Sequence, residues 1–372
     1  MKYDGMPRPK AKAKEPSLDT ARDANRIRRV DKTYLELKQQ GLALKRTLEY
    51  TKSVCPKMVE DLKDRRIDRV VLLGCGDSWF VGTCLEILIE RLLGCSCQSY
   101  DAFEFFSFRC DVLDEHTVVI GQSASGTTRV VLGALAKASE KGAYTVGISN
   151  TENAEILHSS DFGLLVQAKR EGWPTQATSS AIVAVAYIFA VLAKERGFRD
   201  SYCSKVLCEL ESLESKVEEA ICLAEPVMKK NAPLFVNSSF FQATGAGSLF
   251  GAAQISCAKL RELCPVQASC YPLEEFHHYR TLKSKDPLVL FVGTAGQREV
   301  DTALVGTYDG GMIIAIGPRI DPEISKVCDL ECIVPLAMEE LQPVVSMVAA
   351  HLFAYYLAKA KYDANIGYPS EV

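Results

Sequence analysis

The sequence has no excess of positive charge. It holds 43 Lys and Arg against 47 Asp and Glu, a formal net charge of −4 over 372 residues. A protein that holds nucleic acid on a basic surface has the opposite balance, so we expect no nucleic-acid partner. The chain also lacks an apolar run that approaches the roughly 18 residues of a membrane span, and it lacks the apolar core of a secretory leader. We therefore expect a cytoplasmic protein with no membrane partner.

Paired cysteines are absent as well. The 14 cysteines are scattered through apolar segments and form no pair of C-x-x-C blocks. This distribution is typical of reduced thiols in a protein core rather than of zinc ligands or disulfides. We expect neither a metal nor another cofactor.

Two nucleotide-binding patterns are incomplete. Residues 119–128, V-I-G-Q-S-A-S-G-T-T, contain no lysine, so the P-loop pattern G-x-x-x-x-G-K-[ST] is missing and a nucleotide triphosphate with Mg²⁺ is disfavoured. Residues 74–79, G-C-G-D-S-W, lack the last glycine of the dinucleotide pattern G-x-G-x-x-G. An NAD-dependent dehydrogenase is therefore only a third alternative to the functions considered below.

A hydroxyl-rich turn is present where these patterns fail. Ser123, Ser125 and Thr128 follow a predicted buried strand at 117–120 and precede an apolar helix pattern at 129–141. The free N–H groups and partial positive charge of a helix N-terminus favour an anion, and short hydroxyls add donors. The turn therefore predicts a site for a single phosphate ester. The alternative is that the hydroxyls only cap the helix.

Strand and helix patterns alternate along most of the chain. After two amphipathic helices predicted over 33–64, an apolar strand at 69–73 opens into the glycine-containing turn at 74–78 and a helix. Further strands and helices follow, up to a long apolar helix at 175–194. The alternation predicts an α/β fold with parallel sheets, whose ligands bind at the carboxyl ends of the strands.

The second half of the chain repeats the order of the first. Ser123 lies 49 residues after Gly74, and Thr294 lies 49 residues after Gly245. We therefore expect two copies of one flavodoxin-like unit, with the first strand of the second copy at 234–236. The second copy has lost most of the turn hydroxyls, so we place the phosphate in the first copy only.

These patterns divide the chain into four parts. The first thirty residues hold nine Lys and Arg, four Asp and Glu, and few apolar residues, which favours a disordered basic tail. The expected parts are the tail at 1–32, a phosphate-binding domain with its N-terminal helices at 33–198, a linker helix at 199–230 and a second domain at 231–372.

With G-C-G-D-S at 74–78, S-A-S-G-T-T at 123–128 and the duplicated unit, residues 35–372 resemble the double sugar-isomerase (SIS) domain proteins. Similar in pattern are the isomerase half of glucosamine-6-phosphate synthase, the galactosamine-6-phosphate deaminase/isomerases and the fructosamine-6-phosphate deglycases. The resemblance implies two SIS domains, a sugar-phosphate substrate, no cofactor and a homodimer or higher homo-oligomer. No glutamine amidotransferase segment stands before the first domain, so we expect no synthesis of glucosamine phosphate from glutamine by this chain alone.

The resemblance also implies two groups of substrate-binding residues. The phosphate ligands are Gly76, Ser78, Ser123, Ser125 and Thr128. The residues that close the sugar pocket are Thr175, Thr178 and Ser179. Ala124 stands where the family usually has glutamine. The only two tryptophans, Trp79 and Trp173, flank these turns, and they either line the pocket or pack in the core.

The family's catalytic glutamate matches Glu262, and the lysine of its glucosamine-phosphate isomerases matches Lys259. Side chains three residues apart share one face of a helix, so both can address one substrate. Without the resemblance, a surface ion pair worth about 0.2–0.5 kcal/mol is the simpler interpretation. The resemblance implies that Glu262 moves a proton through an enediol or enolamine, while Lys259 stabilises developing charge or forms a transient imine.

A histidine motif follows that helix. Glu275 and His278 match the glutamate and histidine of the family's G-E-x-x-H-G-P, whereas Tyr279 and Arg280 replace its last Gly and Pro. Imidazole titrates near neutral pH, so His278 is the candidate acid or base for opening the sugar ring. In relatives this loop tends to reach across a dimer interface, so His278 acts either in its own chain or in a second copy.

Together these observations predict a phosphosugar isomerase or deaminating isomerase that acts on hexose or amino-sugar 6-phosphates. The alternatives are a fructosamine-6-phosphate deglycase and a sugar-phosphate sensor without catalytic activity. Retention of both Lys259 and Glu262 speaks against the sensor, and the altered residues after His278 speak for it.

Overall fold

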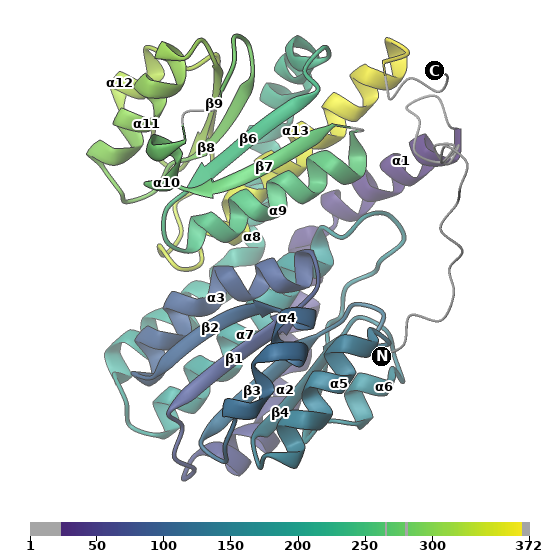
Figure 1. Ribbon diagram of the computed structural model, residues 1–372, viewed down its shortest axis with the longest axis vertical. Coiled ribbons are helices and arrows are strands. Elements are labelled where there is room, and N and C mark those ends of the chain that lie inside the picture. Colours follow the sequence, from purple (N-terminus) through teal and green to yellow (C-terminus); the bar gives the residue numbers. More distant parts are fainter. Residues whose placement is uncertain (1–23, 265, 280–281, 367–372) are drawn as a thin grey trace.

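The computed structural model describes residues 24–264, 266–279 and 282–366, and it consists of two α/β halves (Figure 1). The strands of the first sheet are β1 (Arg69–Gly74), β2 (Ser96–Asp101), β3 (Thr117–Gln122), β4 (Tyr144–Ser149) and β5 (Phe162–Leu165). The strands of the second sheet are β6 (Phe240–Gly245), β7 (Gln267–Pro272), β8 (Pro287–Phe291), β9 (Met312–Gly317) and β10 (Leu330–Ile333).

The two sheets have the same topology. The first has the order β2-β1-β3-β4-β5 and the second the order β7-β6-β8-β9-β10. All strand pairs are parallel. The expected α/β fold with a duplicated flavodoxin-like unit is therefore confirmed. In this topology the chain switches direction between β1 and β3, and the crevice at their carboxyl ends is where ligands bind.

Helices cover both faces of each sheet, as parallel strands require. Those of the first half are α1 (Ala24–Lys38), α2 (Gln40–Leu62), α3 (Asp77–Leu93), α4 (Ala102–Phe108), η2 (Cys110–Val112), α5 (Arg129–Glu140), α6 (Glu155–His158) and α7 (Gln176–Glu195). The long helix α8 (Asp200–Asn231) leads to the second half. The helices there are η3 (Ala232–Phe235), α9 (Ser248–Leu263), α10 (Glu275–His278), α11 (Gln297–Tyr308), α12 (Pro322–Ser325) and α13 (Gln342–Asp363).

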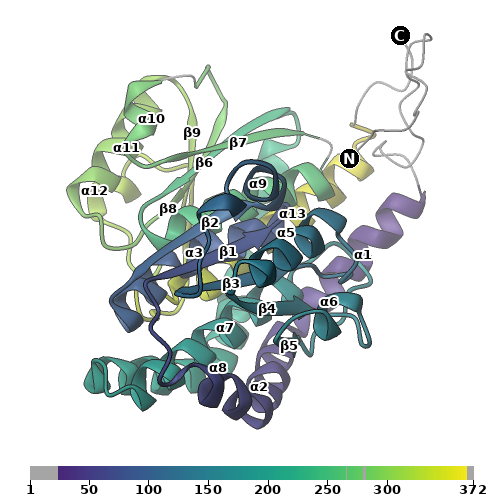
Figure 2. The same ribbon diagram turned by 60° about the horizontal axis from the view of Figure 1, so that its bottom comes forward.

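The two halves meet through the helices that follow their first strands. Helix α3 packs against α9, and both views place the two helices side by side between the sheets (Figure 1 and Figure 2). A single hydrophobic cluster runs through both halves and includes Leu85 and Leu88 of α3 with Leu249 and Ala253 of α9. The contacts of Gly247 with Ile87 and of Lys259 with Asp77 show that the two helices run antiparallel, so the first turn of α3 lies beside the last turns of α9.

The chain start differs from the sequence-based expectation. Residues 24–32, which we assigned to a disordered tail, belong to α1; the rest of that tail lies outside the described residues. Helix α1 packs against α13 of the second half, and the ring of Tyr34 stacks on Tyr355 with centroids 4.4 Å apart. The guanidinium groups of two of the arginines that suggested disorder lie over the ring of Trp173: Arg26, which is buried, and Arg29, which is exposed.

The first strand of the second half is also displaced from its expected place. Residues 234–236 do not form a strand; Leu234 and Phe235 belong to η3, and the strand β6 begins at Phe240. Pro233 fixes its own backbone angle and has no N–H to donate, which suits a helical turn rather than a central strand. The polar residues Gln242 and Thr244 within β6 had obscured the strand pattern.

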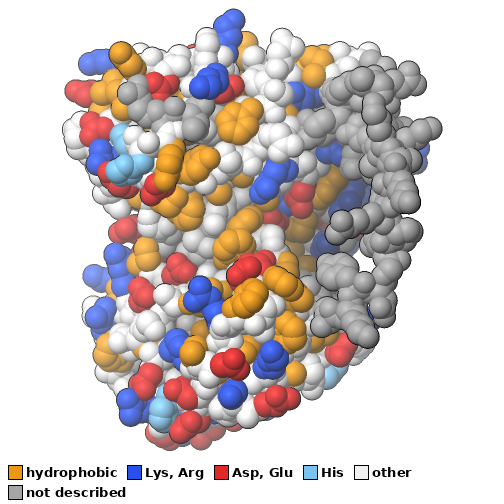
Figure 3. All heavy atoms as spheres, viewed as in Figure 1, with side chains coloured by type: hydrophobic (Ala, Val, Ile, Leu, Met, Phe, Trp, Pro, Cys, Tyr) orange, Lys and Arg blue, Asp and Glu red, His pale blue; other side chains and the backbone are white. Residues whose placement is uncertain are grey.

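Two helices are long and apolar enough to cross a membrane, contrary to our expectation that no such run exists. They are α7 and α13, and most of each lies buried inside the protein. Both belong to the hydrophobic cluster that joins the halves, so their composition is explained by the core that they fill. On the face viewed in Figure 3, Lys and Arg side chains are intermixed with Asp and Glu.

Candidate functional site

The hydroxyl-rich turn connects β3 to α5. The Ser123 hydroxyl lies 2.7 Å from that of Thr128 and 3.4 Å from that of Ser125, and it accepts a hydrogen bond from the Gly126 N–H at 3.1 Å. Gly126 has φ of +70°, and a Cβ there would lie 2.2 Å from the Ala154 side chain. Only glycine fits this tight turn, which gathers three hydroxyls at the N-terminus of α5.

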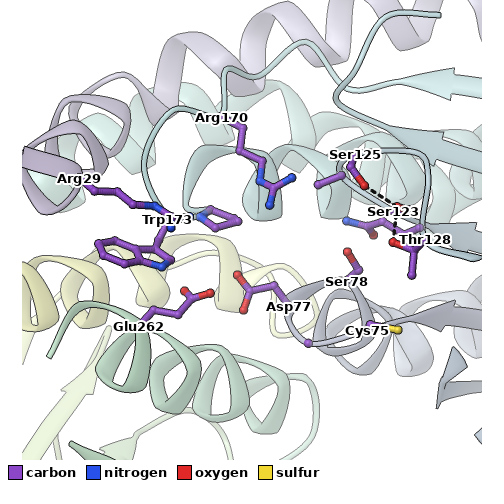
Figure 4. Close-up of a pocket in the computed structure, with 14 residues that line it drawn as sticks. Arg29, Cys75, Asp77, Ser78, Ser123, Ser125, Thr128, Arg170, Trp173 and Glu262 are labelled. Carbon is purple, nitrogen blue, oxygen red and sulfur yellow. Dashed lines mark hydrogen bonds between the residues drawn. The ribbon is translucent and has the colours of Figure 1, made fainter. Parts of the chain in front are cut away.

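A second turn lies beside it. Strand β1 ends at Gly74, and α3 begins at Asp77 after Gly76, which has φ of +57°. A Cβ on Gly76 would meet no atom within 4 Å, so the backbone faces open space. Because β1 and β3 are neighbours, Ser78 of α3 faces the hydroxyls of the first turn (Figure 4).

The two turns form one wall of a cavity of about 280 Å³. This is close to the lower end of small-molecule sites, which span about 300–1,000 Å³. Its lining includes Gly76, Ser78, Ser123, Ser125 and Thr128. Across the cavity lie side chains from α1, α9 and the loop before α7: Arg29, Glu262, Arg170 and Trp173.

An ion cluster from both halves forms the floor of the cavity. Lys259 of α9 is fully buried, and its amine lies 2.6 Å from the carboxylate of Asp77 and within hydrogen-bonding distance of Glu262. Glu262 also lines the cavity, with its side chain one-third exposed. The amine of Lys259 therefore lies behind the two carboxylates and is not among the groups that face a ligand.

The charges of this cluster change one another's proton affinity. Burial raises the pKa of Glu262 above its usual value; the charge of Asp77 raises it further, whereas Lys259 and Arg29 oppose the rise. Burial alone would lower the pKa of Lys259, but Asp77 and Glu262 together raise it. A carboxylate with a raised pKa is a stronger base than a free one, so at a cavity wall it is suited to accepting a proton from a ligand.

The equivalent turn of the second half is already occupied by a side chain. The carboxylate of Glu299 in α11 accepts hydrogen bonds from the N–H groups of Gly293 at 2.7 Å and Ala295 at 3.2 Å. Glu299 is buried, and burial raises its pKa. A phosphate at this turn would have to displace the carboxylate. A wider hollow of about 470 Å³ lies next to the turn, lined by Phe250, Leu273 and Arg298 among others.

Comparison with known proteins agrees with the topology. Residues 64–194, from the end of α2 into α7, match the SIS domain family. The second half repeats the same strand order. The chain therefore contains a SIS domain, followed by a second unit of the same topology. Among solved structures it is similar to the C-terminal domain of glucosamine-fructose-6-phosphate aminotransferase from Francisella tularensis, with a TM-score of 0.79 and 20% identity over 88% of this chain and 96% of that one.

Two further similar proteins are a curated relative and a solved structure. A glutamine–fructose-6-phosphate aminotransferase (isomerizing) of Bacteroides thetaiotaomicron is 28% identical over 312 residues, which are 82% of this chain and 50% of the relative. The chain thus spans about half the length of that curated relative. Glucosamine-6-phosphate deaminase of Thermotoga maritima has the same fold, with a TM-score of 0.69 and 19% identity over 90% of this chain and 96% of that one.

The cavity brings together some of the predicted residues. The five expected phosphate ligands and Glu262 line it, and Trp173 does so too, whereas Trp79 packs against the hydrophobic core. Thr175, Thr178 and Ser179 are buried at the start of α7, and the hydroxyl of Ser179 donates to Gln40. These three therefore lie behind Trp173 and Pro174, which form the cavity surface.

His278 and Glu275 do not line this cavity. Both belong to the short helix α10 in the second half, and the His278 side chain is 65% exposed. Figure 3 shows histidine on the surface of that half. The His278 ring lies 4.0 Å from the carboxylate of Glu274, and Glu274 lines the second hollow. Arg280, which replaces the family's proline, lies outside the described residues.

Sequence reasoning missed three charged residues of the site. Asp77 stands inside the G-C-G-D-S motif, but the sequence does not show that its carboxylate lies beside Lys259 in the folded chain. Arg29 was assigned to the tail, and Arg170 lies in a loop without a motif. No cluster of three His, Cys, Asp or Glu side chains that could hold a metal ion occurs within the described ranges.

Proposed function

We propose that this chain is an isomerase or deaminating isomerase of hexose or amino-sugar 6-phosphates. One observation carries the proposal: a single cavity joins the hydroxyl turns at one end to the carboxylate of Glu262 at the other (Figure 4). A phosphate held by Ser78, Ser123, Ser125 and Thr128 would direct the sugar chain toward Glu262. Binding energy from the phosphate would then hold the reacting carbons near the base.

Glu262 is the proposed base of the reaction. It takes a proton from one carbon of the open-chain sugar and returns it to the adjacent carbon, so that an enediol or enolamine forms between the two steps. The raised pKa of Glu262 supports this role, since it makes the carboxylate a stronger base than a free one.

Lys259 has an electrostatic role in this proposal. Its amine has no exposed surface and is held between Asp77 and Glu262, so we assign it to fixing the Glu262 carboxylate rather than to forming an imine. Its positive charge also favours negative charge that develops at the reacting carbons. A buried cation with two carboxylate partners keeps its charge, as the raised pKa of Lys259 indicates.

His278 requires a second copy of the chain in this scheme. It lies outside the cavity of its own chain, so ring opening by His278 calls for a homodimer in which the α10 loop of one copy reaches the cavity of the other. Release of an amine from a fructosamine 6-phosphate is a second candidate reaction of the same cavity. It is favoured by Arg29 and Arg170, whose role is argued below.

Proton NMR in heavy water tests the proposal. The purified chain is given fructose 6-phosphate, glucosamine 6-phosphate, galactosamine 6-phosphate and a fructosamine 6-phosphate in turn. We expect deuterium to enter the carbon next to the carbonyl of at least one of them, and we expect Glu262→Gln to slow that exchange by about 10²–10⁴-fold, the usual contribution of a general base.

Glu60→Gln is the matched control, because Glu60 is exposed on α2 and, among the described residues, forms an ion pair with Lys63 alone. This variant should exchange at the rate of the unaltered chain. Saturable binding of these sugar phosphates without any exchange would overturn the catalytic assignment and leave the sensor. Exchange that persists in Glu262→Gln would remove Glu262 from the base role.

A further inference from the structure

The cavity has two chemically different ends (Figure 4). The hydroxyls of Ser123, Ser125 and Thr128 form one end, and Trp173, Arg29 and Glu262 form the other, with Arg170 projecting between them. Among the described residues that line the cavity, the only Lys or Arg residues are Arg29 and Arg170. Arg29 stands in the part of the cavity that the phosphate of a bound sugar would leave free, and Arg170 lies between that part and the hydroxyls (Figure 4).

Arg29 has unused hydrogen-bond donors. Its neighbour on α1, Arg26, donates to the backbone carbonyl of Glu262 at 2.6 Å and is buried. Arg29 is exposed, and no carboxylate or carbonyl of the described residues accepts from its guanidinium. Its carbon Cζ lies 4.3 Å from the ring centroid of Trp173. A guanidinium stacked on an indole keeps the N–H groups at its edge available for a ligand.

The wall that carries these groups is fixed by α1. The Thr33 hydroxyl accepts a hydrogen bond from the N–H of Trp173 at 2.8 Å, and the Glu36 carboxylate accepts from the N–H groups of Glu171 and Gly172. Arg170 directly precedes this anchored segment. Among the described residues its guanidinium, too, has no ion pair or hydrogen bond. Two guanidinium groups on an anchored wall are thus free to bind an anion.

We infer that Arg29, assisted by Arg170, binds a carboxylate that the substrate carries on the substituent at its reacting end. The inference rests on the proposed function, because that function places the phosphate at the hydroxyl end and the reacting carbons beside Glu262. The substrate class is then a ketose 6-phosphate joined through a nitrogen on C1 to an amino acid. The guanidinium fork matches a carboxylate, and the indole of Trp173 offers an apolar surface to the carbon chain of the substituent.

Two other roles for the arginines make different predictions. If Arg29 only opposes the rise in the pKa of Glu262, its removal changes the pH dependence of the reaction in the same way for every substrate. If Arg170 binds the phosphate, its removal weakens the binding of sugar phosphates without a carboxylate as much as the binding of those with one. Only if the arginines recognise the carboxylate should their removal change the ratio of the affinities for a ligand with a carboxylate and for its neutral amide.

Calorimetric titration of the full chain, which measures ligand affinity, tests the inference. The parent protein and each variant also carry Glu262→Gln, which prevents turnover. The ligands are fructose 6-phosphate, its C1 conjugate with glycine and the same conjugate with glycinamide, which replaces the carboxylate by a neutral amide. We expect the glycine conjugate to bind at least about tenfold more tightly than the glycinamide conjugate, as one charge-assisted pair provides. Arg29→Gln should bring this ratio close to one and leave the affinity for fructose 6-phosphate within about twofold.

Arg28→Gln is the matched control, because Arg28 is an exposed arginine of α1 that does not line the cavity; it should keep the ratio. A ratio near one in the parent, or a ratio that survives Arg29→Gln, overturns the inference alone. So does tighter binding of 6-phosphogluconate than of the glycine conjugate, since its carboxylate lies on the sugar chain. If no sugar phosphate binds, neither these ligands nor those of the exchange experiment, the proposed function fails and the inference fails with it.

Discussion

Asp77 links the phosphate-binding half to the catalytic helix. It opens α3 directly after the Gly76 turn, and its carboxylate lies 2.6 Å from the amine of Lys259 in the other half. A fully buried lysine without a partner would be costly, so Asp77 and Glu262 together keep Lys259 charged. The same negative charge raises the pKa of Glu262. One side chain therefore affects both the stability of the cluster and the proton affinity of the proposed base.

We predict that Asp77→Asn moves the acid limb of the pH–kcat/KM profile to lower pH. Loss of the charge removes one cause of the raised pKa of Glu262 and leaves Lys259, which lowers it, in place. Lys259→Met should move the limb in the opposite direction. The profile is measured for proton exchange on the best substrate, with Asp64→Asn, an exposed aspartate, as control. An acid limb that stays fixed in Asp77→Asn would show that Asp77 does not act on the base.

At the scale of elements, the bounds of helices and strands were predicted best where an apolar strand is followed by a glycine-containing turn. Strands β1 and β3 and helix α3 lie within two residues of their expected places, because buried parallel strands are continuous apolar runs. Helix α1 was partly missed because the arginines of its first turns pack on Trp173 and on Glu262, which lie far away in the sequence. For the same reason the site residues Asp77, Arg29 and Arg170 gave no sequence signal: they come together only in the folded chain.

Glu299 of helix α11 supplies a carboxylate to the turn that follows β8, where it accepts hydrogen bonds from backbone N–H groups. We predict that Glu299→Ala lowers the free energy of unfolding by about 1–3 kcal/mol, since the N–H groups of Gly293 and Ala295 lose their acceptor. Millimolar phosphate or sulfate should then raise the melting temperature of this variant more than that of the unaltered chain, because the vacated turn can accept the ion. Thermal unfolding with and without the ions measures both effects.

The control for this experiment is Glu323→Ala, which changes an exposed glutamate in the first turn of α12. It should show the melting temperature and the phosphate response of the unaltered chain. An equal response to phosphate in Glu299→Ala and in the unaltered chain would mean that the carboxylate does not occupy an anion site.

At the scale of the whole molecule, the core shared by the halves contains a buried histidine. His351 of α13 is fully buried, and neither ring nitrogen has a hydrogen-bond partner among the described residues. Burial, with a contribution from the charge of Lys259, lowers the pKa of His351 from its ordinary value of 6.5 to about 3. Imidazole is therefore neutral in the native core and charged in the unfolded chain over most of this range.

We predict that the protein loses stability as pH falls from about 6.5 toward 3, and that His351→Leu removes part of this loss. Between the two pKa values the unfolded state binds one more proton than the native state, so the free energy of unfolding falls by about 1.4 kcal/mol per pH unit from this residue. Urea unfolding at several pH values measures the slope. His158→Gln, at an exposed histidine, should keep the full slope. An unchanged slope in His351→Leu would place the acid sensitivity elsewhere, because a leucine in this apolar position cannot bind the proton that the unfolded histidine takes up.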